Sequence, residues 1–291
     1  MMRLRRYLWL ALSFGLVAWL TLPLIATARK RHHSNNEVTP SNATQQGLKP
    51  ACTNPNFPEP APTGNLGIDA QCGLEGSGGK EAAQNSVKNN FCASGAPAEI
   101  GLVDLTTLQK EVEKNPNINF GSKGPTTDRD PLKNLGEGKL LTLKAFVFFA
   151  KQEKGESVNC GTTVPDQPIF HDIHILLVDE KNLPQTGEPM QVNIAKQCSG
   201  IVAEMTPHHR PDVWTEANVQ KVAKAKAMVR VTGQQFFDSS HVPCANGAAV
   251  GKNPKRVSLW EIHPIYKFEV CTSNCTGEGQ WLPLDQWLKQ H

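Results

Sequence analysis

Residues 139–151 read KLLTLKAFVFFAK, a long apolar run rich in aromatic residues that predicts a buried β-strand. The folded core is expected to begin just before it, near Gly138. Four more β-prone segments follow, each bounded by turn-forming residues. They are Ile169–Asp179, Gly200–Thr206, Met228–Phe237 and Ser258–Cys271. Residues 212–227 predict a helix between the third and fourth strands, with Asp212 placed to cap it.

Three strands, a helix and two more strands, with long connections after the first and fourth strands, resemble the OB-fold. We therefore expect a mainly β domain over residues 138–291. It would be a five-stranded OB-like Greek-key barrel with a helix between strands three and four, the resemblance covering about residues 138–271. The resemblance implies a binding surface near strands two and three and the two long loops. The tail is expected to add an amphipathic turn that packs Trp281, Leu284 and Trp287 onto the domain.

The chain before the domain divides into three segments. Residues 1–28 carry three arginines and then an uncharged apolar run, 7–28, that is long enough to span a bilayer as a hydrophobic N-terminal helix. This pattern indicates export, through either a signal peptide cleaved after Ala28 or a retained membrane anchor. Residues 29–80 are rich in Pro, Asn, Thr, Gly and Ser, which predicts a disordered, flexible linker. Residues 81–137 form a helical and irregular lead-in, with helices expected near 81–92 and 105–114.

The net charge of +3 comes entirely from Arg3, Arg5 and Arg6. The rest of the chain carries equal numbers of acidic and basic side chains. Because a nucleic-acid-binding domain usually has a basic excess, nucleic acid is not an expected partner. The membrane is a partner only if residues 7–28 stay attached as an anchor.

Eight cysteines follow the hydrophobic segment, and an even number in an exported chain predicts disulfide bonds. They are Cys52, Cys72, Cys92, Cys160, Cys198, Cys244, Cys271 and Cys275. No CxxC pair is present, which argues against a zinc ribbon or a thioredoxin-like redox site. Spacing alone leaves the connectivity open, although Cys271 and Cys275 are the first expected pair because they can close a tight turn. Disulfides at Cys160, Cys198 and Cys244 would stiffen loops.

Three further segments carry a second resemblance. KNNFCASG (88–95), VRVTGQQFFDSSH (229–241) and LWEIHPIYKFEVC (259–271) resemble a family of exported bacterial proteins for which no activity is established. The resemblance spans about residues 71–275. It implies a bacterial source and transfers no activity. Together with the export signal, we expect a location in the periplasm or at the cell surface.

Polar residues inside the predicted strands are the candidate site. Because alternate side chains of a strand share a face, Asp172 lies on one face with His174, and Glu261 on one face with His263. Glu204 occupies the corresponding face of strand three, opposite Ala203 and Met205. In the OB order these strands are neighbours, so the five groups form one ladder of carboxylates and imidazoles. His208, His209 and His241 are expected nearby, with Arg230 and Arg210 as the nearest arginines.

Several interpretations of this ladder stay open. His174, Glu204, Glu261 and His263 could bind a divalent metal ion or transfer protons, although no HExxH spacing is present. A structural role, with cross-strand ion pairs on a solvated face, explains the same pattern. A third interpretation is a contact surface for a polar ligand, formed by Asp172, His174, Glu204, Arg230, Glu261 and His263. A small basic cluster, Lys252, Lys255 and Arg256, is interpreted as part of a solvated loop.

The sequence favours an exported binding module that recognises a polar ligand or an envelope partner. The alternatives are a metal-dependent hydrolase or nuclease that uses the His/Glu ladder, and a structural envelope protein. No sequence motif predicts a cofactor. A divalent metal ion is the one cofactor that the ladder could bind. Nucleophilic catalysis has little support, because the chain lacks a GxSxG elbow and its cysteines are expected in disulfides.

Overall fold

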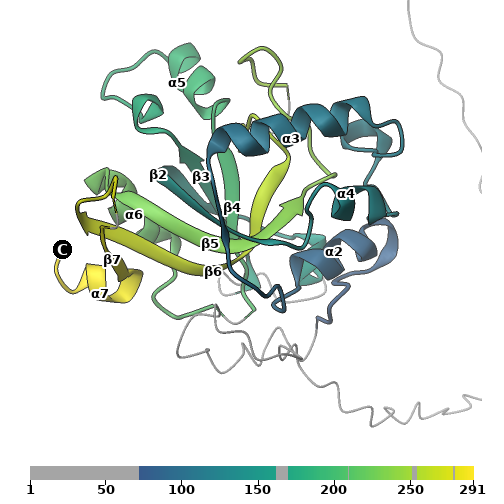
Figure 1. Ribbon diagram of the computed structural model, residues 1–291, viewed down its shortest axis with the longest axis horizontal. Coiled ribbons are helices and arrows are strands. Elements are labelled where there is room, and N and C mark those ends of the chain that lie inside the picture. The colour runs from purple at the N-terminus through teal and green to yellow at the C-terminus, as the bar shows by residue number, and fades with distance from the viewer. Residues whose placement is uncertain (1–71, 162–169, 209, 251–253, 278) are drawn as a thin grey trace, which may run out of the picture. The chain divides into compact units, whose positions relative to one another are not determined.

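The computed structural model describes residues 72–161, 170–208, 210–250, 254–277 and 279–291 (Figure 1). These residues form a mixed α/β domain. Its strands are β1 (Ala98–Ile100), β2 (Leu140–Gln152), β3 (Ile173–Val178), β4 (Ile201–Met205), β5 (Met228–Phe237), β6 (Trp260–Ser273) and β7 (Gln280–Pro283). Its α-helices are α2 (Ala82–Lys88), α3 (Leu102–Lys114), α4 (Asp130–Asn134), α5 (Met190–Gln197), α6 (Glu216–Ala225) and α7 (Leu284–Leu288). Among the short 3₁₀ turns, η3 (Ser157–Asn159) matters most for the site.

The strands form one seven-stranded mixed sheet in the order β1-β2-β3-β4-β6-β5, with β7 paired to β6. β2 also pairs with β5, so β2, β3, β4, β6 and β5 close into a ring of five strands. Within the ring, β4 runs parallel to β6, and the other neighbours are antiparallel. β1 adds a short parallel strand to β2. The ring brings the polar positions of β3, β4 and β6 together.

All five predicted strands are present, and the fourth has the expected bounds, Met228–Phe237. The helix between strands three and four is also present but begins later than predicted. Asp212 lies in a turn closed by the Trp214 N–H donating to the Pro211 carbonyl at 2.8 Å. Thr215 caps the helix instead, since its side chain accepts from the Asn218 N–H.

A mainly β domain was an incomplete prediction, because helices and two more strands belong to the fold. The three residues of β1 are too few to show a periodic pattern, and their pairing with β2 defines them as a strand. α5 lacks a buried apolar face, since none of its residues is fully buried. The tail packs as expected: Leu284 and Trp287 of α7 are buried, although Trp281 lies in β7.

The main hydrophobic core takes alternate residues from the ring strands, and α3, α6 and α7 pack on the same core. Ile175 of β3, Ala203 of β4 and Ile262 of β6 are fully buried in it. Their sequence neighbours His174, Glu204 and His263 therefore point to the opposite face of the same strands. This second face carries the predicted ladder.

Residues 72–93, the end of the predicted linker and the start of the predicted lead-in, pack against that second face. Gln84 of α2 accepts from the Ser239 backbone N–H at 2.9 Å and donates to the Ser240 hydroxyl at 2.8 Å. Further along, the Tyr266 hydroxyl donates to the Asn90 carbonyl at 2.9 Å. The polar face of the sheet is consequently an internal interface of the domain.

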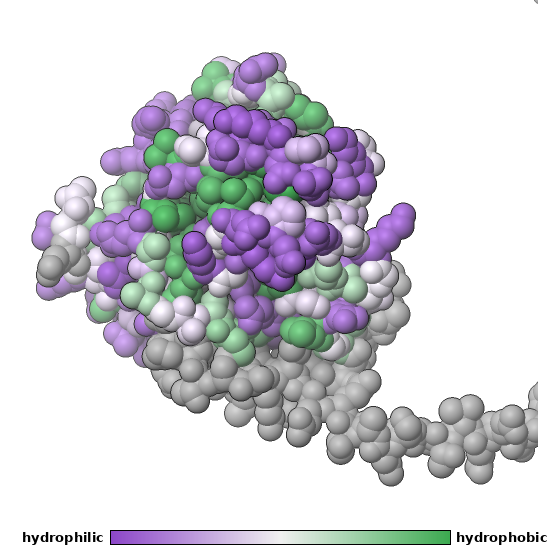
Figure 2. Space-filling view, turned by 45° about the vertical axis from the view of Figure 1, so that its right-hand side comes forward, coloured by the Kyte–Doolittle hydropathy of each residue, from purple (hydrophilic) through white to green (hydrophobic). Residues whose placement is uncertain are grey.

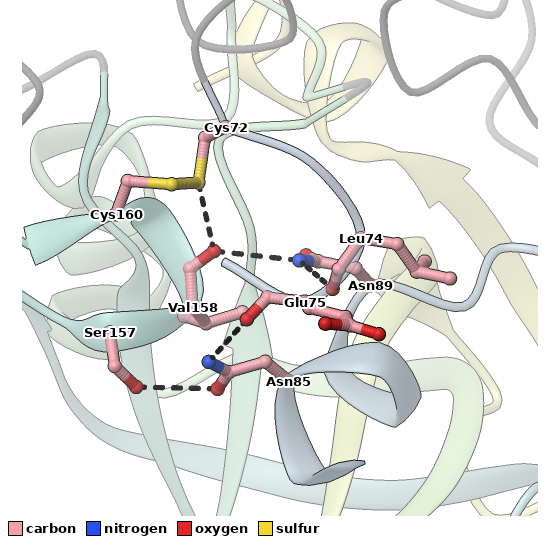
Figure 3. The surroundings of a disulfide bond; sticks show 8 residues. All are labelled: Cys72, Leu74, Glu75, Asn85, Asn89, Ser157, Val158 and Cys160. Atoms are coloured by element: carbon pink, nitrogen blue, oxygen red, sulfur yellow. Dashed lines mark hydrogen bonds between the residues drawn. A yellow bond between two sulfur atoms is a disulfide. The ribbon is translucent and has the colours of Figure 1, made fainter. Parts of the chain in front are cut away.

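Residues 72–80, which prediction placed in the linker, are tied to the domain by a disulfide (Figure 3). Cys72 bonds to Cys160, which follows η3. Beside this bond the Asn89 amide donates to the Val158 carbonyl at 3.4 Å (Figure 3). The bond and the amide together hold the lead-in against the loop that follows β2.

Two other disulfides are described, Cys198–Cys244 and the predicted Cys271–Cys275 pair. Cys92 is disulfide-bonded as well, and none of the described cysteines is free. Cys52 lies outside the described residues. The prediction that the cysteines form disulfides is confirmed for every described cysteine.

Within the described ranges, no helix has the length and apolar character needed to cross a bilayer. The segment predicted as signal peptide or anchor, 1–28, lies outside those ranges, as does most of the predicted linker.

On one face of the domain, hydrophilic and apolar residues are interleaved (Figure 2). The most exposed large apolar side chains are Val103, Met190, Val250, Leu74 and Val192.

Candidate functional site

The ladder forms as the strand order predicts. His174 of β3 and Glu204 of β4 are direct cross-strand partners. Ala203 pairs with Ile262 in a parallel register, so Glu204 lies beside His263 of β6 and diagonal to Glu261. Asp172 immediately precedes β3. The five predicted groups therefore lie on neighbouring strands.

Glu204 is the centre of this group, which we call the Glu204 cluster: Lys88, Glu156, Asp172, His174, Glu204 and His263. One carboxylate oxygen of Glu204, Oε1, is 3.1 Å from His174 Nε2. The other, Oε2, is 2.8 Å from His263 Nδ1. Lys88 Nζ from α2 is 3.9 Å from Oε2. His174 Nε2 is also 3.3 Å from Oε1 of Glu156, the residue directly before η3.

The prediction of a solvated ladder is wrong. Glu204, His263 and Asp172 have no exposed surface, and His174 is 3% exposed. The ladder is buried because α2 and the loop that leads into η3 lie over the strands. Lys88 of α2 and Glu156 of this loop contact the ladder with their charged groups. The groups are therefore not surface ion pairs, and their charges interact with little screening by water.

Sequence reasoning missed the two cluster members that come from outside the strands, Lys88 and Glu156. Lys88 opens the segment KNNFCASG, and this resemblance is the only signal that singled it out. Glu156 lies in the loop between β2 and η3, where no periodicity marks it. Which loop folds over the ladder depends on tertiary packing, which strand periodicity does not encode.

Charges in the half of the cluster around His174 support one another. Burial disfavours the charged imidazole, yet Glu204 and Glu156 outweigh burial and raise the pKa of His174 well above its usual value. Burial likewise opposes the charge on Glu156, but His174 and Lys88 lower its pKa to about 2. For Glu204 the same neighbours, with His263, overcome burial and hold the pKa well below its usual range. A protonated imidazole thus lies between two carboxylates.

The other half is formed by neutral groups. Burial, with the charges of Glu156 and Glu204, raises the pKa of Asp172 well above its usual value. Burial lowers the pKa of His263 against the opposing effect of Glu204. A hydrogen bond between the Asp172 carboxyl and Glu156 also favours the neutral form of Asp172. Burial also lowers the pKa of Arg210 to about 10, although Asp172 partly offsets it.

Glu261 belongs to an adjoining group rather than to the cluster itself. It forms a short ion pair with Arg256, which is also 3.3 Å from Asp238 Oδ2. Asp238 further pairs with Nδ1 of His241, which is 33% exposed, at 2.5 Å. The placement of Arg256 in a solvated loop was wrong, because this side chain is 1% exposed. Its two carboxylate partners are what allow the guanidinium to be buried.

Arg230 is part of the predicted site but lies apart from it. It forms a bidentate pair with Glu269, with both N···O distances 2.8 Å, and stacks over Trp281. Arg230 precedes Phe236, the partner of Glu261, by roughly 20 Å of extended strand. Because the Arg230 guanidinium is paired with Glu269, Arg230 is not a member of the Glu204 cluster.

Of the other predicted neighbours, His208 and Lys255 belong to the part of the chain that the structure describes. His208 is buried at the end of β4, where its carbonyl accepts from Thr206 Oγ1 at 3.2 Å. Lys255 is half-buried in the loop before β6. His209 and Lys252 lie outside the described residues.

Two triads of the cluster have metal-ligand geometry. Glu156, His174 and Glu204 each place one donor atom within 4.8 Å of the others, and so do Asp172, Glu204 and His263. Glu204 is the member common to both. Imidazole nitrogen and carboxylate oxygen are ligands that zinc, manganese and ferrous iron accept. Of the four residues predicted as metal ligands, His174, Glu204 and His263 lie in these triads, and Glu261 does not.

Comparisons with protein-family models, with curated proteins and with solved structures give no significant match to this chain.

Proposed function

We propose that this chain is an exported module that binds a divalent metal ion at the Glu204 cluster. The ligand of the binding module is then a cation rather than an unspecified polar molecule or envelope partner. The observation that carries the proposal is the pair of imidazole–carboxylate triads that share Glu204. Asp172 adds a further oxygen ligand, since it is fully buried and belongs to the second of these triads.

An OB-like barrel is the architecture that we propose for the module. The ring order β2-β3-β4-β6-β5 and the position of α6 between β4 and β5 support it. The cluster would then lie on the outer side of strands two, three and five of the barrel. In an OB-fold the binding surface involves strands two and three, which agrees with this placement.

Burial favours binding over hydrolysis. A hydrolytic metal centre keeps one coordination position open to water and substrate. Glu156, with its side chain 20% exposed, is the most accessible ligand of the two triads, while the others are nearly or fully buried. The metal-dependent hydrolase or nuclease therefore remains the second candidate. A structural envelope protein is the third candidate, since buried imidazole–carboxylate pairs also occur as structural ion pairs.

Export is supported by the cysteines. The three described disulfides are typical of proteins from an oxidising compartment outside the cytoplasm. Periplasm or cell surface is the location that we propose, with residues 7–28 as the targeting segment.

Metal analysis of the full chain tests the proposed function. The protein would be exported in an expression host, purified in mild detergent, incubated with Zn²⁺ or Mn²⁺ and desalted. We expect at least one ion per chain by mass spectrometry. At a free ion concentration 100 times Kd, binding adds about 2.7 kcal/mol of stability. That raises the melting temperature by about 5–10 °C for a domain of this size.

The matched control is Glu269→Gln, a carboxylate that pairs with Arg230 away from the cluster and should leave metal binding unchanged. Glu204→Gln should abolish it. No stoichiometric metal, together with a melting temperature that EDTA does not change, would refute the proposed function. Turnover of a phosphodiester substrate by the loaded protein would instead favour the hydrolase.

A further inference from the structure

We propose that the Cys72–Cys160 disulfide positions Glu156 as a metal ligand, so that the cation site of the Glu204 cluster is complete only after this bond has formed. Glu156 comes from the loop before η3, and the bond joins the end of that turn to the segment before α2. This inference rests on the proposed function, and it identifies what controls that site.

Glu156 is the ligand of its triad that the sheet does not place. His174 and Glu204 are cross-strand partners, so the register of β3 and β4 fixes their separation. Glu156 instead reaches His174 Nε2 from a loop, at 3.3 Å. It also forms a hydrogen bond with the carboxyl group of Asp172, a member of the second triad. Whether this carboxylate joins the other ligands therefore depends on what holds its loop.

The disulfide constrains that loop within one turn of Glu156. Cys160 follows Glu156 by four residues, at the C-terminal end of η3. Across the turn, the Glu156 carbonyl accepts hydrogen bonds from the backbone N–H groups of Asn159 and Gly161, at 3.1 and 2.7 Å. Because these hydrogen bonds close the turn, a constraint on Cys160 is also a constraint on the Glu156 backbone.

The same disulfide contacts the chain that leads into β3. Cys72, Cys160 and Phe170 form a separate buried hydrophobic cluster, with exposed fractions of 1, 6 and 7%. Phe170 precedes Asp172 by two residues. The disulfide therefore packs against the entry to the strand and holds the Glu156 loop beside Asp172.

Hydrogen bonds from α2 and its ends hold the η3 turn in the same place (Figure 3). The Asn89 amide donates to the Val158 carbonyl at 3.4 Å. The Ser157 hydroxyl forms hydrogen bonds with Asn85 Oδ1, at 3.3 Å, and with the Glu81 carboxylate. Both α2 and the disulfide thus fix the turn that follows Glu156, and the disulfide makes this arrangement covalent.

Burial makes the bond a lasting constraint rather than a reversible switch. Cys72 and Cys160 are almost fully buried, so a reducing thiolate has little access to their sulfur atoms. The bond forms when the two thiols lose two electrons and two protons to a disulfide oxidant, which becomes a dithiol. A chain whose thiols are still reduced would hold His174 and Glu204 in place without a fixed Glu156. We therefore expect metal loading after export, in the compartment where the bond forms.

Mn²⁺ affinity in disulfide variants of the full chain tests this inference, with free Mn²⁺ followed by electron paramagnetic resonance. Replacing Cys72 and Cys160 together by alanine stands in for the reduced chain and leaves no thiol that could itself bind metal. Affinity should fall by at least about 10-fold, the scale of losing a group that orients a metal ligand. The matched control replaces Cys271 and Cys275 by alanine. Cys271 lies eight residues beyond His263 on β6, roughly 25 Å along the strand, so this control should change affinity less than about 2-fold.

A double-mutant cycle separates positioning of Glu156 from a general loosening of the domain. Glu156→Gln alone should weaken Mn²⁺ binding. If the bond acts through Glu156, removing Cys72 and Cys160 in the Glu156→Gln background should cost less than about 2-fold more. Losses that add in full would overturn the inference.

Ser157→Ala keeps the test decisive if the chain without Cys72 and Cys160 does not fold. This variant removes the hydrogen bonds to Glu81 and Asn85 and leaves the disulfide in place. Affinity should fall by about 3-fold or more, as expected for the loss of a hydrogen bond that holds the loop. Ser199→Ala is its control, since that hydroxyl donates to the Lys196 carbonyl at 2.7 Å after α5 and should leave affinity unchanged. Equal affinities in the two serine variants would then overturn the inference.

The outcomes separate the two proposals. Unchanged Mn²⁺ affinity in a folded chain without Cys72 and Cys160 would overturn the positioning role and leave metal binding intact. No ion in the unaltered protein would refute the proposed function itself.

Discussion

Replacing Glu204 by glutamine tests whether the cluster is a linked set of charges. Gln keeps the shape of the side chain but removes the negative charge from the centre of the cluster. Glu204 is fully buried and contacts His174, His263 and Lys88 at 3.1, 2.8 and 3.9 Å. Removing one partner of a buried ionic group costs about 3–5 kcal/mol, because the remaining charges stay buried without compensation. For a domain of this size the melting temperature should fall by about 6–20 °C.

Circular dichroism melts in EDTA measure this loss without any contribution from bound metal. The control is Glu111→Gln, which removes an exposed carboxylate paired with Lys114 at 2.8 Å. It should change stability by at most about 0.5 kcal/mol. A loss below about 1 kcal/mol for Glu204→Gln, the range of an exposed ion pair, would refute the view that these charges are coupled. The pKa of His174, followed by NMR, should also fall in the Glu204→Gln variant, since Glu204 is the strongest influence raising it.

Three more predictions concern the protonation of His174, its role as a metal ligand, and the disulfides. Glu204 and Glu156 outweigh burial and raise the pKa of His174 in the folded state. The stability that protonated His174 gives the folded state is therefore complete below pH 6.5 and is lost as the pH rises through the folded-state pKa. Urea titrations in EDTA between pH 6 and 10 should show declining stability, and a constant value would contradict the assignment. Metal affinity should rise over the same range, because the ion displaces the His174 proton; isothermal titration that finds no pH dependence would exclude His174 as a ligand. Finally, removing the Cys198–Cys244 bond, which spans 46 residues, should cost about 4 kcal/mol, against about 2 for Cys271–Cys275, which spans 4. Equal losses in denaturant titrations would contradict this ranking.

The ladder was predictable from sequence because two simple rules determine it. Alternation along a strand puts His174 and His263 on faces opposite the core, and the order of the ring strands puts β3, β4 and β6 side by side. Glu204 is central because it lies on the middle strand of these three. Neither rule needs the details of packing.

The burial of the ladder was not predictable by these rules. Lys88 comes from a helix that precedes the ring, and Glu156 from a loop that a disulfide holds in place. Such contacts join residues far apart in sequence, and they depend on how connections fold over the sheet. Arg256 was misassigned for the same reason, since its Gly-, Asn- and Pro-rich surroundings indicate a solvated loop while its partners Asp238 and Glu261 lie elsewhere in the chain.

The energetic cost of the cluster is itself an argument for function. Replacing a buried ionic group by apolar side chains of similar volume is often neutral or stabilising by about 1–4 kcal/mol. The opposite face of the same strands is packed in that way, with Ile175, Ala203 and Ile262 fully buried. The same strands could therefore have a purely apolar second face, yet they bury Glu204 against two imidazoles and an ammonium. A fold that needed only stability would gain nothing from this arrangement, whereas a cation-binding module requires donors that are held together before the ion arrives.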